Sequence, residues 1–362
     1  MDIHHFHSLK INNIAFLIPD LYQFYQMKRN ILYLLFVTCF IVSMQSCHSD
    51  KTGTWANGDI NSDVKKQIAD LNQKLFTGIM TKNVGAVKAM LSAQLVTRAK
   101  GNLDSIINRS AKKYNAKDYE VLDEYYKVNT TANIPDTITS NKGNDADYIL
   151  SYKAVNEQTY ISLLVTKNLP VNCLITVIYG KYGDSWKINI LQIGDYSILN
   201  KTPQEYYKIA LGLYNEGDLL DATNNIILVS QLVNPGGDRF TYKNNSEMKI
   251  FYSKVIDEAN ARYQFPFIIG QVKTKPQIFS ISPEIIEEEG HKGVFPLISY
   301  KSAIKLTDSV ALKAENQEIQ KSIGRLFKGI DQNNSNIFYQ AYNNIPNGKS
   351  PAPHYGFIQK LK

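Results

Sequence analysis

The segment 171–193, VNCLITVIYGKYGDSWKINILQI, decides the fold class of this chain. Two runs of β-branched, aromatic and aliphatic residues, Val171–Tyr179 and Trp186–Ile193, flank the turn Lys181–Asp184. Such runs on either side of turn-forming residues are typical of two antiparallel strands. Similar runs come before this pair, so we expect an antiparallel meander. The preceding strands are expected at Tyr119–Asn129, Tyr148–Val155 and Thr159–Thr166.

The pattern upstream of these strands is helical. From Asp63, which we expect to cap the first helix, apolar residues recur at spacings of three and four, as on one face of an amphipathic helix. These residues are Val64, Ile68, Leu71, Leu75 and Ile79. A second, shorter helix is expected from Val84 to Leu91 and a third from Leu103 to Ala111. Helices followed by antiparallel strands predict an α+β domain over residues 62–200.

Two stretches of this domain resemble the NTF2-like (cystatin-like cone) superfamily. They are LNQKLFTGIMTKNVGAVKAML at 71–91 and the closing strand GDSWKINILQI at 183–193. The resemblance implies helices closed over a strongly curved antiparallel sheet. Enzymes of that superfamily place an Asp or His inside the cone as a general base. The candidate strands of this domain offer only Asn172, Cys173, Thr176 and Asn189 at mid-strand, which favours a binding module over an enzyme.

The next segment, 201–264, is predicted to be a helical middle layer. Thr202 followed by Pro203 and Glu205 is typical of a helix N-terminus. A set of small and turn residues resembles one tetratricopeptide unit: Ala210, Gly217, Asp218, Ala222, Ile226 and Pro235. A further helix is expected over Glu247–Tyr263. Because one unit is visible where a solenoid needs about three, we interpret the segment as a bridging layer.

The remaining residues, 265–362, predict a second, small α+β unit. Its strands are expected at Gln277–Ser282, Val294–Ile304, Ile337–Tyr342 and Tyr355–Ile358. Asp308 is expected to cap the helix that follows it. The acidic cluster Glu284, Glu287, Glu288 and Glu289 is interpreted as a solvated helix end, because the alternating oxygen ligands of a calcium loop are missing.

The N-terminal residues are expected to contain a signal that targets the chain to the cell envelope. Lys28 and Arg29 precede the fourteen uncharged residues Ile31–Met44, a run too short to span a bilayer but typical of a signal-peptide core. The following Ser46-Cys47 resembles the lipobox of bacterial lipoproteins of the Bacteroidetes type. That resemblance implies cleavage before Cys47 and lipidation of its sulfur and new amino group. An ordinary secretory signal or a short membrane anchor is the alternative.

The expected signal also divides the N-terminal part of the chain into three segments. Residues 27–46 are expected to be the signal peptide and residues 1–26, which precede its own methionine, an upstream mis-start. Residues 47–61 are rich in Ser, Gly, Asn, Asp and Thr, and we expect them to form a flexible tether.

Composition and the absence of known motifs argue against several classes of function. The net charge of +7 over 362 residues is small, and no Lys/Arg block is present, so nucleic acid is not an expected partner. No metal-ligand spacing, nucleophile elbow or phosphate-binding glycine loop occurs, and no cofactor or metal is expected. Cys173 lies in an apolar strand, where a thiol is usually an inert core residue.

We therefore expect a lipoprotein that is attached by Cys47 to the outer membrane and faces the periplasm or the cell surface. It would bind a protein or another envelope ligand without catalysis. The alternatives are a cone-fold enzyme acting on a small apolar ligand, and a glycan-binding accessory lipoprotein that uses exposed tyrosines.

Overall fold

The computed structural model describes residues 51–99, 101–288, 290–348 and 351–361. Lys28, Arg29, Ser46 and Cys47, with the predicted segments 1–26 and 27–46, lie outside the described residues. The predicted α+β class is confirmed: eight α-helices and three sheets occur within the described part of the chain. The α-helices are α2 Ser62–Met80, α3 Val84–Met90, α4 Ala93–Ala99, α5 Leu103–Tyr114, α6 Pro203–Glu216, α7 Leu219–Leu232, α8 Asn245–Arg262 and α9 Ser309–Leu326.

The strands are distributed over a main sheet, a small sheet and a C-terminal sheet. The main sheet has the order β1-β2-β5-β6-β7, with β1 Gly53–Ala56, β2 Tyr119–Val128, β5 Gln158–Thr166, β6 Val171–Tyr182 and β7 Ser185–Ile198. The small sheet has the order β3-β4-β8, with β3 Ile134–Thr139, β4 Tyr148–Ala154 and β8 Phe240–Tyr242. The C-terminal sheet has the order β13-β12-β11-β10-β9, with β9 Phe267–Ile268, β10 Gln277–Glu288, β11 His291–Lys301, β12 Asn336–Tyr342 and β13 Tyr355–Lys360.

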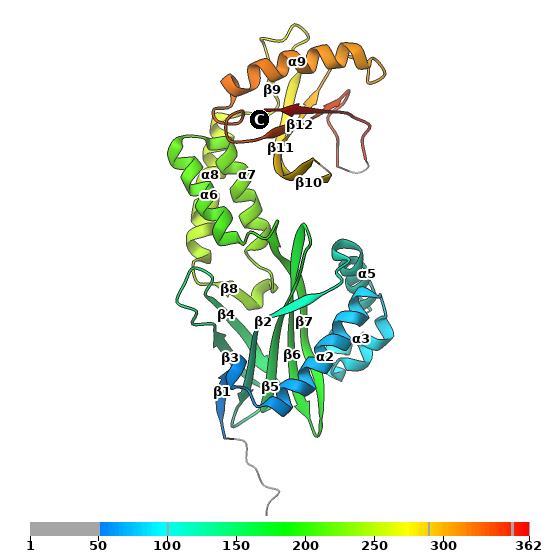
Figure 1. Ribbon diagram of the computed structural model, residues 1–362, viewed down its shortest axis with the longest axis vertical. Coiled ribbons are helices and arrows are strands. Elements are labelled where there is room, and N and C mark those ends of the chain that lie inside the picture. The colour runs from blue at the N-terminus through cyan, green and yellow to red at the C-terminus, as the bar shows by residue number, and fades with distance from the viewer. Residues whose placement is uncertain (1–50, 100, 289, 349–350, 362) are drawn as a thin grey trace, which may run out of the picture. The chain divides into compact units, whose positions relative to one another are not determined.

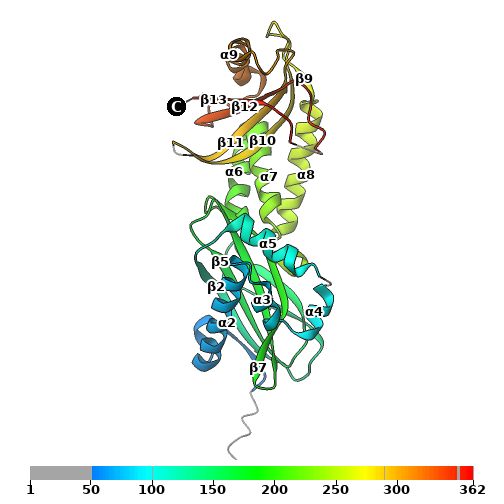
Figure 2. The same ribbon diagram turned by 90° about the vertical axis from the view of Figure 1, so that its right-hand side faces the viewer.

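The main sheet is the middle layer of three. Helices α2 to α5 cover one face, while the small sheet and α7 cover the other (Figures 1 and 2). Side chains alternate between the two layers: on β6, Cys173 and Ile175 join the helical side and Leu174 and Ile178 the other. Because β5 and β6 are buried on both faces, their sequences are nearly continuous apolar runs. This explains why they dominate the sequence pattern.

Helix α2 begins one residue before Asp63, the predicted cap. Its N-cap is Asn61, whose side chain accepts hydrogen bonds from the backbone N–H groups of Asp63 (2.9 Å) and Val64 (3.4 Å). Asp63 instead places its negative charge in the first turn, where the helix dipole favours it. Ile68, Leu75 and other residues of the predicted apolar face are buried against the main sheet.

The prediction of a flexible tether over 47–61 is wrong from Gly53 onward. Strand β1 pairs antiparallel with β2, and the Trp55 ring stacks on Tyr126 with 5.6 Å between ring centroids. This pairing supplies hydrogen bonds and buried aromatic area that the polar composition of the segment does not reveal. Residues 53–61 are therefore the first part of the folded body.

The predicted meander is interrupted. Strands β3 and β4 form a hairpin that leaves the main sheet, and β8 pairs antiparallel with β4 through Tyr148 and Tyr242. Strand β8 follows α7 in the sequence, so the small sheet crosses the predicted boundary between 62–200 and 201–264. One apolar cluster continues from this sheet through α7 to the C-terminal sheet.

The helical segment 201–264 contains α6, α7 and α8 side by side (Figures 1 and 2). Thr202 precedes α6 as predicted, and its backbone N–H donates to the Glu205 carboxylate at 2.7 Å. Gly217 ends the helix in a left-handed conformation with φ of 82°, which glycine adopts at little steric cost.

The C-terminal unit packs α9 against its five-stranded sheet. Helix α9 connects β11 to β12, which run parallel, whereas the other neighbours are antiparallel. Asp308 accepts from the Ala311 N–H at 3.0 Å, as its predicted capping role requires. The acidic cluster is not a helix end: Glu284, Glu287 and Glu288 lie on β10, which pairs with β11, and Glu289 lies outside the described residues.

Candidate functional site

Strand β7 forms one edge of the main sheet, and its outer side is covered near its beginning and again at its end, where Ile198 and Lys201 exchange backbone hydrogen bonds of 3.0 and 2.9 Å. The Ser92 N–H donates to the Ile188 carbonyl at 2.9 Å, and the Arg98 guanidinium donates to the Asn189 carbonyl at 3.0 Å. Beyond these residues, β6 lies on one side of Leu191–Gly194 and no described strand lies on the other. No backbone hydrogen bond outside the sheet involves these four residues within the described ranges.

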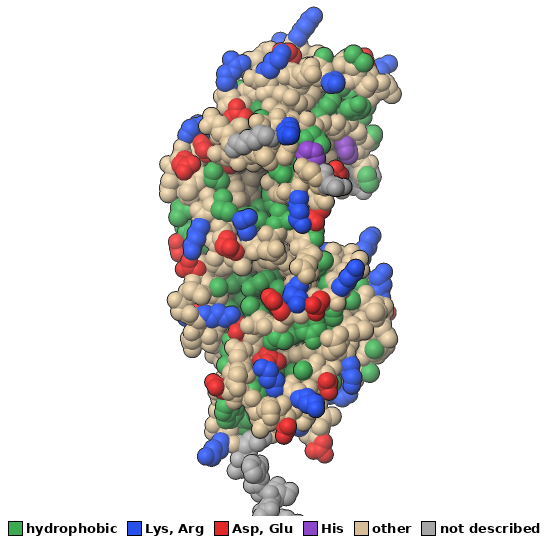
Figure 3. All heavy atoms as spheres, in the orientation of Figure 1, with side chains coloured by type: hydrophobic (Ala, Val, Ile, Leu, Met, Phe, Trp, Pro, Cys, Tyr) green, Lys and Arg blue, Asp and Glu red, His purple; other side chains and the backbone are tan. Residues whose placement is uncertain are grey.

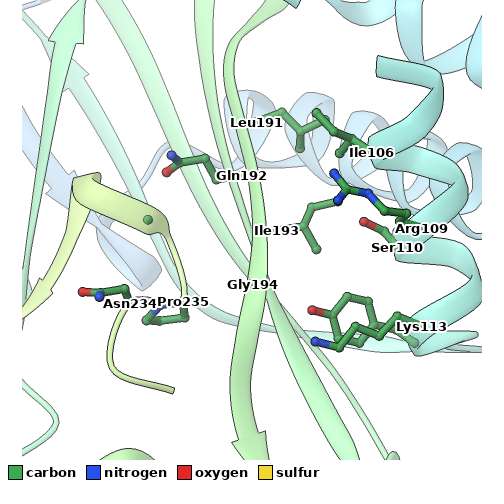
Figure 4. A pocket seen from close by; sticks show the side chains of 12 residues that line it. Ile106, Arg109, Ser110, Lys113, Leu191, Gln192, Ile193, Gly194, Asn234 and Pro235 are labelled. Atoms are coloured by element: carbon green, nitrogen blue, oxygen red, sulfur yellow. The ribbon is translucent and has the colours of Figure 1, made fainter. Parts of the chain in front are cut away.

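A groove of about 500 Å³ runs along this uncovered edge, and we call it the β7 groove (Figure 4). Its floor is the strand segment Leu191–Gly194. Helix α5 forms one wall and the loop after α7 forms the other. The lining residues are Ile106, Arg109, Ser110, Lys113, Tyr114, Leu191, Gln192, Ile193, Gly194, Asn234, Pro235 and Gly237.

The strand points alternate side chains at the two walls. Leu191 and Ile193 extend toward α5, whereas Gln192 extends toward the loop (Figure 4). A Cβ built on Gly194 would lie 2.4 Å from the Pro235 carbonyl oxygen, so only glycine allows the loop this close. The loop wall therefore depends on Gly194.

Helix α5 supplies the charge of the groove. Arg109 is exposed, and no hydrogen bond or ion pair of its side chain occurs within the described residues. Lys113 pairs with Asp195 at 2.7 Å, and the Tyr114 hydroxyl donates to the same carboxylate at 2.8 Å. Burial, together with the Asp195 charge, raises the pKa of Tyr114 above its ordinary value, so this hydroxyl remains a donor at neutral pH. The guanidinium of Arg109 is thus the cation available to a ligand.

A second hollow of about 530 Å³ shares Gln192 with the β7 groove. It is lined by Lys153, Asp238 and Arg239, among others. The side-chain oxygen of Gln192 is buried and has no hydrogen-bond partner in the described structure. The β7 groove is lined by Arg109 and Lys113 and by no acidic residue, and the second hollow by two basic residues and one acidic residue, so basic residues outnumber acidic ones in both.

Of the polar residues predicted at mid-strand, Asn172 and Asn189 are hydrogen-bonded within the chain, whereas the buried Thr176 hydroxyl has no partner in the described structure. Asn189 bonds to Asn156 at 2.9 Å and accepts from Tyr182 at 2.8 Å. Asn172 donates to Ser197 and Asn200, and the Thr176 side chain is fully buried. Burial raises the pKa of the Cys173 thiol to about 12, so it stays protonated, as its apolar strand predicted. The space between α2 and the sheet is filled by aromatic and aliphatic side chains, among them Tyr126, Tyr160, Tyr179 and Trp186.

Two acidic residues at mid-strand were missed by sequence reasoning. Asp123 and Glu124 on β2 are 4% and 3% exposed. Asp123 accepts from the Tyr148 hydroxyl at 2.5 Å and pairs with Lys142 at 2.8 Å, while Glu124 pairs with Lys65 at 2.9 Å. The segment YEVLDEYYKV contained the signal, because adjacent residues of a strand point to opposite faces, so two adjacent acids in a strand that is covered on both faces are both buried. Asp123 and Glu124 pair with consecutive residues of β5, Leu163 and Ser162, and so lie on opposite faces of the main sheet.

A third hollow, of about 710 Å³, lies against α6, α7 and β11. Its carboxylate, Asp221, accepts from Asn334 at 2.9 Å and Asn333 at 3.1 Å. Burial raises the pKa of Asp221. Because amide groups of the chain already occupy this carboxylate, we regard the β7 groove as the better candidate site.

Metal binding and membrane spanning can also be assessed for the described residues. No group of three or more His, Cys, Asp or Glu side chains is placed to hold a metal ion within those residues. None of their helices combines the length and the apolar character needed to cross a bilayer. On the face drawn in Figure 3, basic and acidic side chains are interspersed.

Fold and site together define an α+β protein with a cation-bearing groove at a sheet edge. No family model, curated protein or solved structure matches this chain.

Proposed function

We propose that the chain is a cell-envelope lipoprotein, attached through Cys47 to the outer membrane, that acts as a non-catalytic binding module. The observation that carries the binding role is the β7 groove, where an uncovered strand edge lies beside the unpaired Arg109. An uncovered edge presents unpaired backbone donors and acceptors to which another strand can add. The membrane role rests on the sequence of the signal segment and on Cys47.

The buried acidic residues support binding rather than catalysis. A general acid or base must reach its substrate, but Asp123 is enclosed by Tyr148, Lys142 and Asn57, and Glu124 is held by Lys65. Packed side chains fill the space between α2 and the main sheet, where an enzyme of the cone fold would hold a ligand. Many tyrosines, including Tyr148, Tyr300 and Tyr339, are core residues, so they offer no exposed platform for a glycan.

Fractionation of cells that express the full chain tests the anchoring. The wild-type protein should enter the detergent phase and incorporate a labelled fatty acid, while Cys47→Ala should lose both properties. Cys39→Ala is the matched control, since Cys39 lies in the segment expected to be cleaved, and it should behave as wild type. Labelling and membrane retention of Cys47→Ala would overturn the proposal.

A further inference from the structure

We infer that the β7 groove binds an extended, acidic segment of a partner polypeptide as an added β-strand. This inference deepens the proposed function and rests on it. The first support is the backbone. Along Leu191–Gly194 every second residue turns its N–H and C=O away from β6, and no described residue pairs with them. A peptide in β-conformation presents the complementary row of donors and acceptors.

The walls of the groove fit a strand rather than a compact ligand. The four floor residues extend over roughly 13 Å, at about 3.3 Å each, and both walls follow them. An added strand would point alternate side chains at Ile106 on α5 and at Pro235 on the loop. Both wall residues are apolar. Pro235 is already buried, but Ile106 is 39% exposed, so covering Ile106 removes apolar surface from water.

The charges select an acidic occupant. Arg109 and Lys113 line the β7 groove without an acidic lining residue, and Lys153 and Arg239 outnumber Asp238 in the adjoining hollow. The nearby Asp195 is already held by Lys113. A Glu or Asp side chain of a bound strand could pair with Arg109 without displacing an existing contact. Complementary charge of this kind gives specificity and speeds association.

The same charges disfavour a second copy of this chain. In a two-fold dimer the same surface patch of both protomers meets. Pairing of two β7 edges would therefore bring Arg109 near its symmetry mate, with like charges facing across the interface. The partner is instead a different polypeptide with an acidic extended segment.

Selection from a display library of randomised seven-residue peptides against the immobilised mature chain tests the inference. Selected sequences should be rich in β-branched residues and contain Glu or Asp. A synthesised binder should lose about tenfold in affinity when its acid becomes Lys. It should lose a similar factor when the N–H groups that face β7 are methylated, because methylation removes the strand-pairing donors.

The matched pair Arg109→Glu and Lys112→Glu locates the site. Both residues are exposed on α5, but only Arg109 lines the groove. Arg109→Glu should weaken the selected peptide about tenfold, and Lys112→Glu should change it little. An affinity for the selected peptide that is changed neither by Arg109→Glu nor by backbone methylation overturns the inference. A selection that enriches no peptide also overturns it. Neither result affects the fractionation of Cys47→Ala, so the two proposals fail separately.

Discussion

The backbone of Gly194 lies against Pro235: a Cβ added to Gly194 would come within 2.4 Å of the Pro235 carbonyl oxygen and 3.0 Å of its carbonyl carbon. Gly194 belongs to the edge strand β7 and Pro235 to the loop after α7. This contact sets the position of one wall of the β7 groove. The packing of the loop after α7 and the shape of the β7 groove therefore both depend on the absence of a side chain at Gly194.

Gly194→Ala should consequently both destabilise the protein and deform the groove. The new methyl group must displace a backbone carbonyl, which costs about 1–3 kcal/mol in the free energy of unfolding. Gly212→Ala is the matched control, because no atom lies within 4 Å of the Cβ it would add to α6. It should raise the free energy of unfolding by up to about 1 kcal/mol through helix propensity. Urea unfolding of both variants measures these effects, and equal stabilities would contradict the packing described.

The hydrogen bond between Tyr148 and Asp123 joins the small sheet to the main sheet. Tyr148→Phe should lower the free energy of unfolding by about 1–3 kcal/mol, because a buried carboxylate loses its closest donor. Tyr355→Phe removes a hydroxyl without a hydrogen bond in the described structure and should change stability by less than about 0.5 kcal/mol. Chemical denaturation compares the two. A Tyr148→Phe protein as stable as wild type would show that Lys142 and Asn57 suffice to hold Asp123.

The lowered pKa of Asp147 predicts that the free energy of unfolding decreases in acid. Hydrogen bonds from Lys243 and Ser140 lower its pKa from 3.8 to about 2. Between these values the unfolded chain takes up a proton that the folded chain does not, so the stabilisation is complete above about pH 4 and declines as pH falls toward 2. Asp147→Asn should be less stable than wild type at neutral pH, and the difference should shrink on acidification.

Thermal unfolding of wild type and Asp147→Asn along a pH series measures this difference. Asp70→Asn serves as a control, since Asp70 is exposed on α2 and its carboxylate makes no hydrogen bond or ion pair within the described residues. A difference between wild type and Asp147→Asn that stays constant down to about pH 2 would contradict the lowered pKa.

Sequence reasoning succeeded where burial leaves a strong pattern. Strands β5 and β6 are buried on both faces, and α2 buries one regular stripe, so their residues predicted them directly. Strand β1 was missed because its short segment becomes a strand only by pairing with the distant β2, and β3 because its six residues, which pair with the next strand β4, include a Pro and an Asp. Tertiary pairing of this kind leaves little local signal.

The groove could not be predicted for a related reason. Its lining comes from three separate parts of the chain, around Ile106, Leu191 and Pro235, which only the fold brings together. Asp123 could have been noticed as an acid inside an apolar strand, but its partner Tyr148 comes from another sheet. The signal segment and Cys47 remain predictions.

Site-specific photo-cross-linking in living cells tests the central claim most directly, that the β7 groove is where this protein binds its partner. A benzophenone amino acid replaces Ile106, which lines the groove, or Val310, which is 80% exposed on α9 and lies outside it. We expect a polypeptide adduct of discrete mass from position 106 that is absent from position 310 and is lost when Arg109→Glu is added. No adduct at 106, or the same adducts at both positions, would contradict the account.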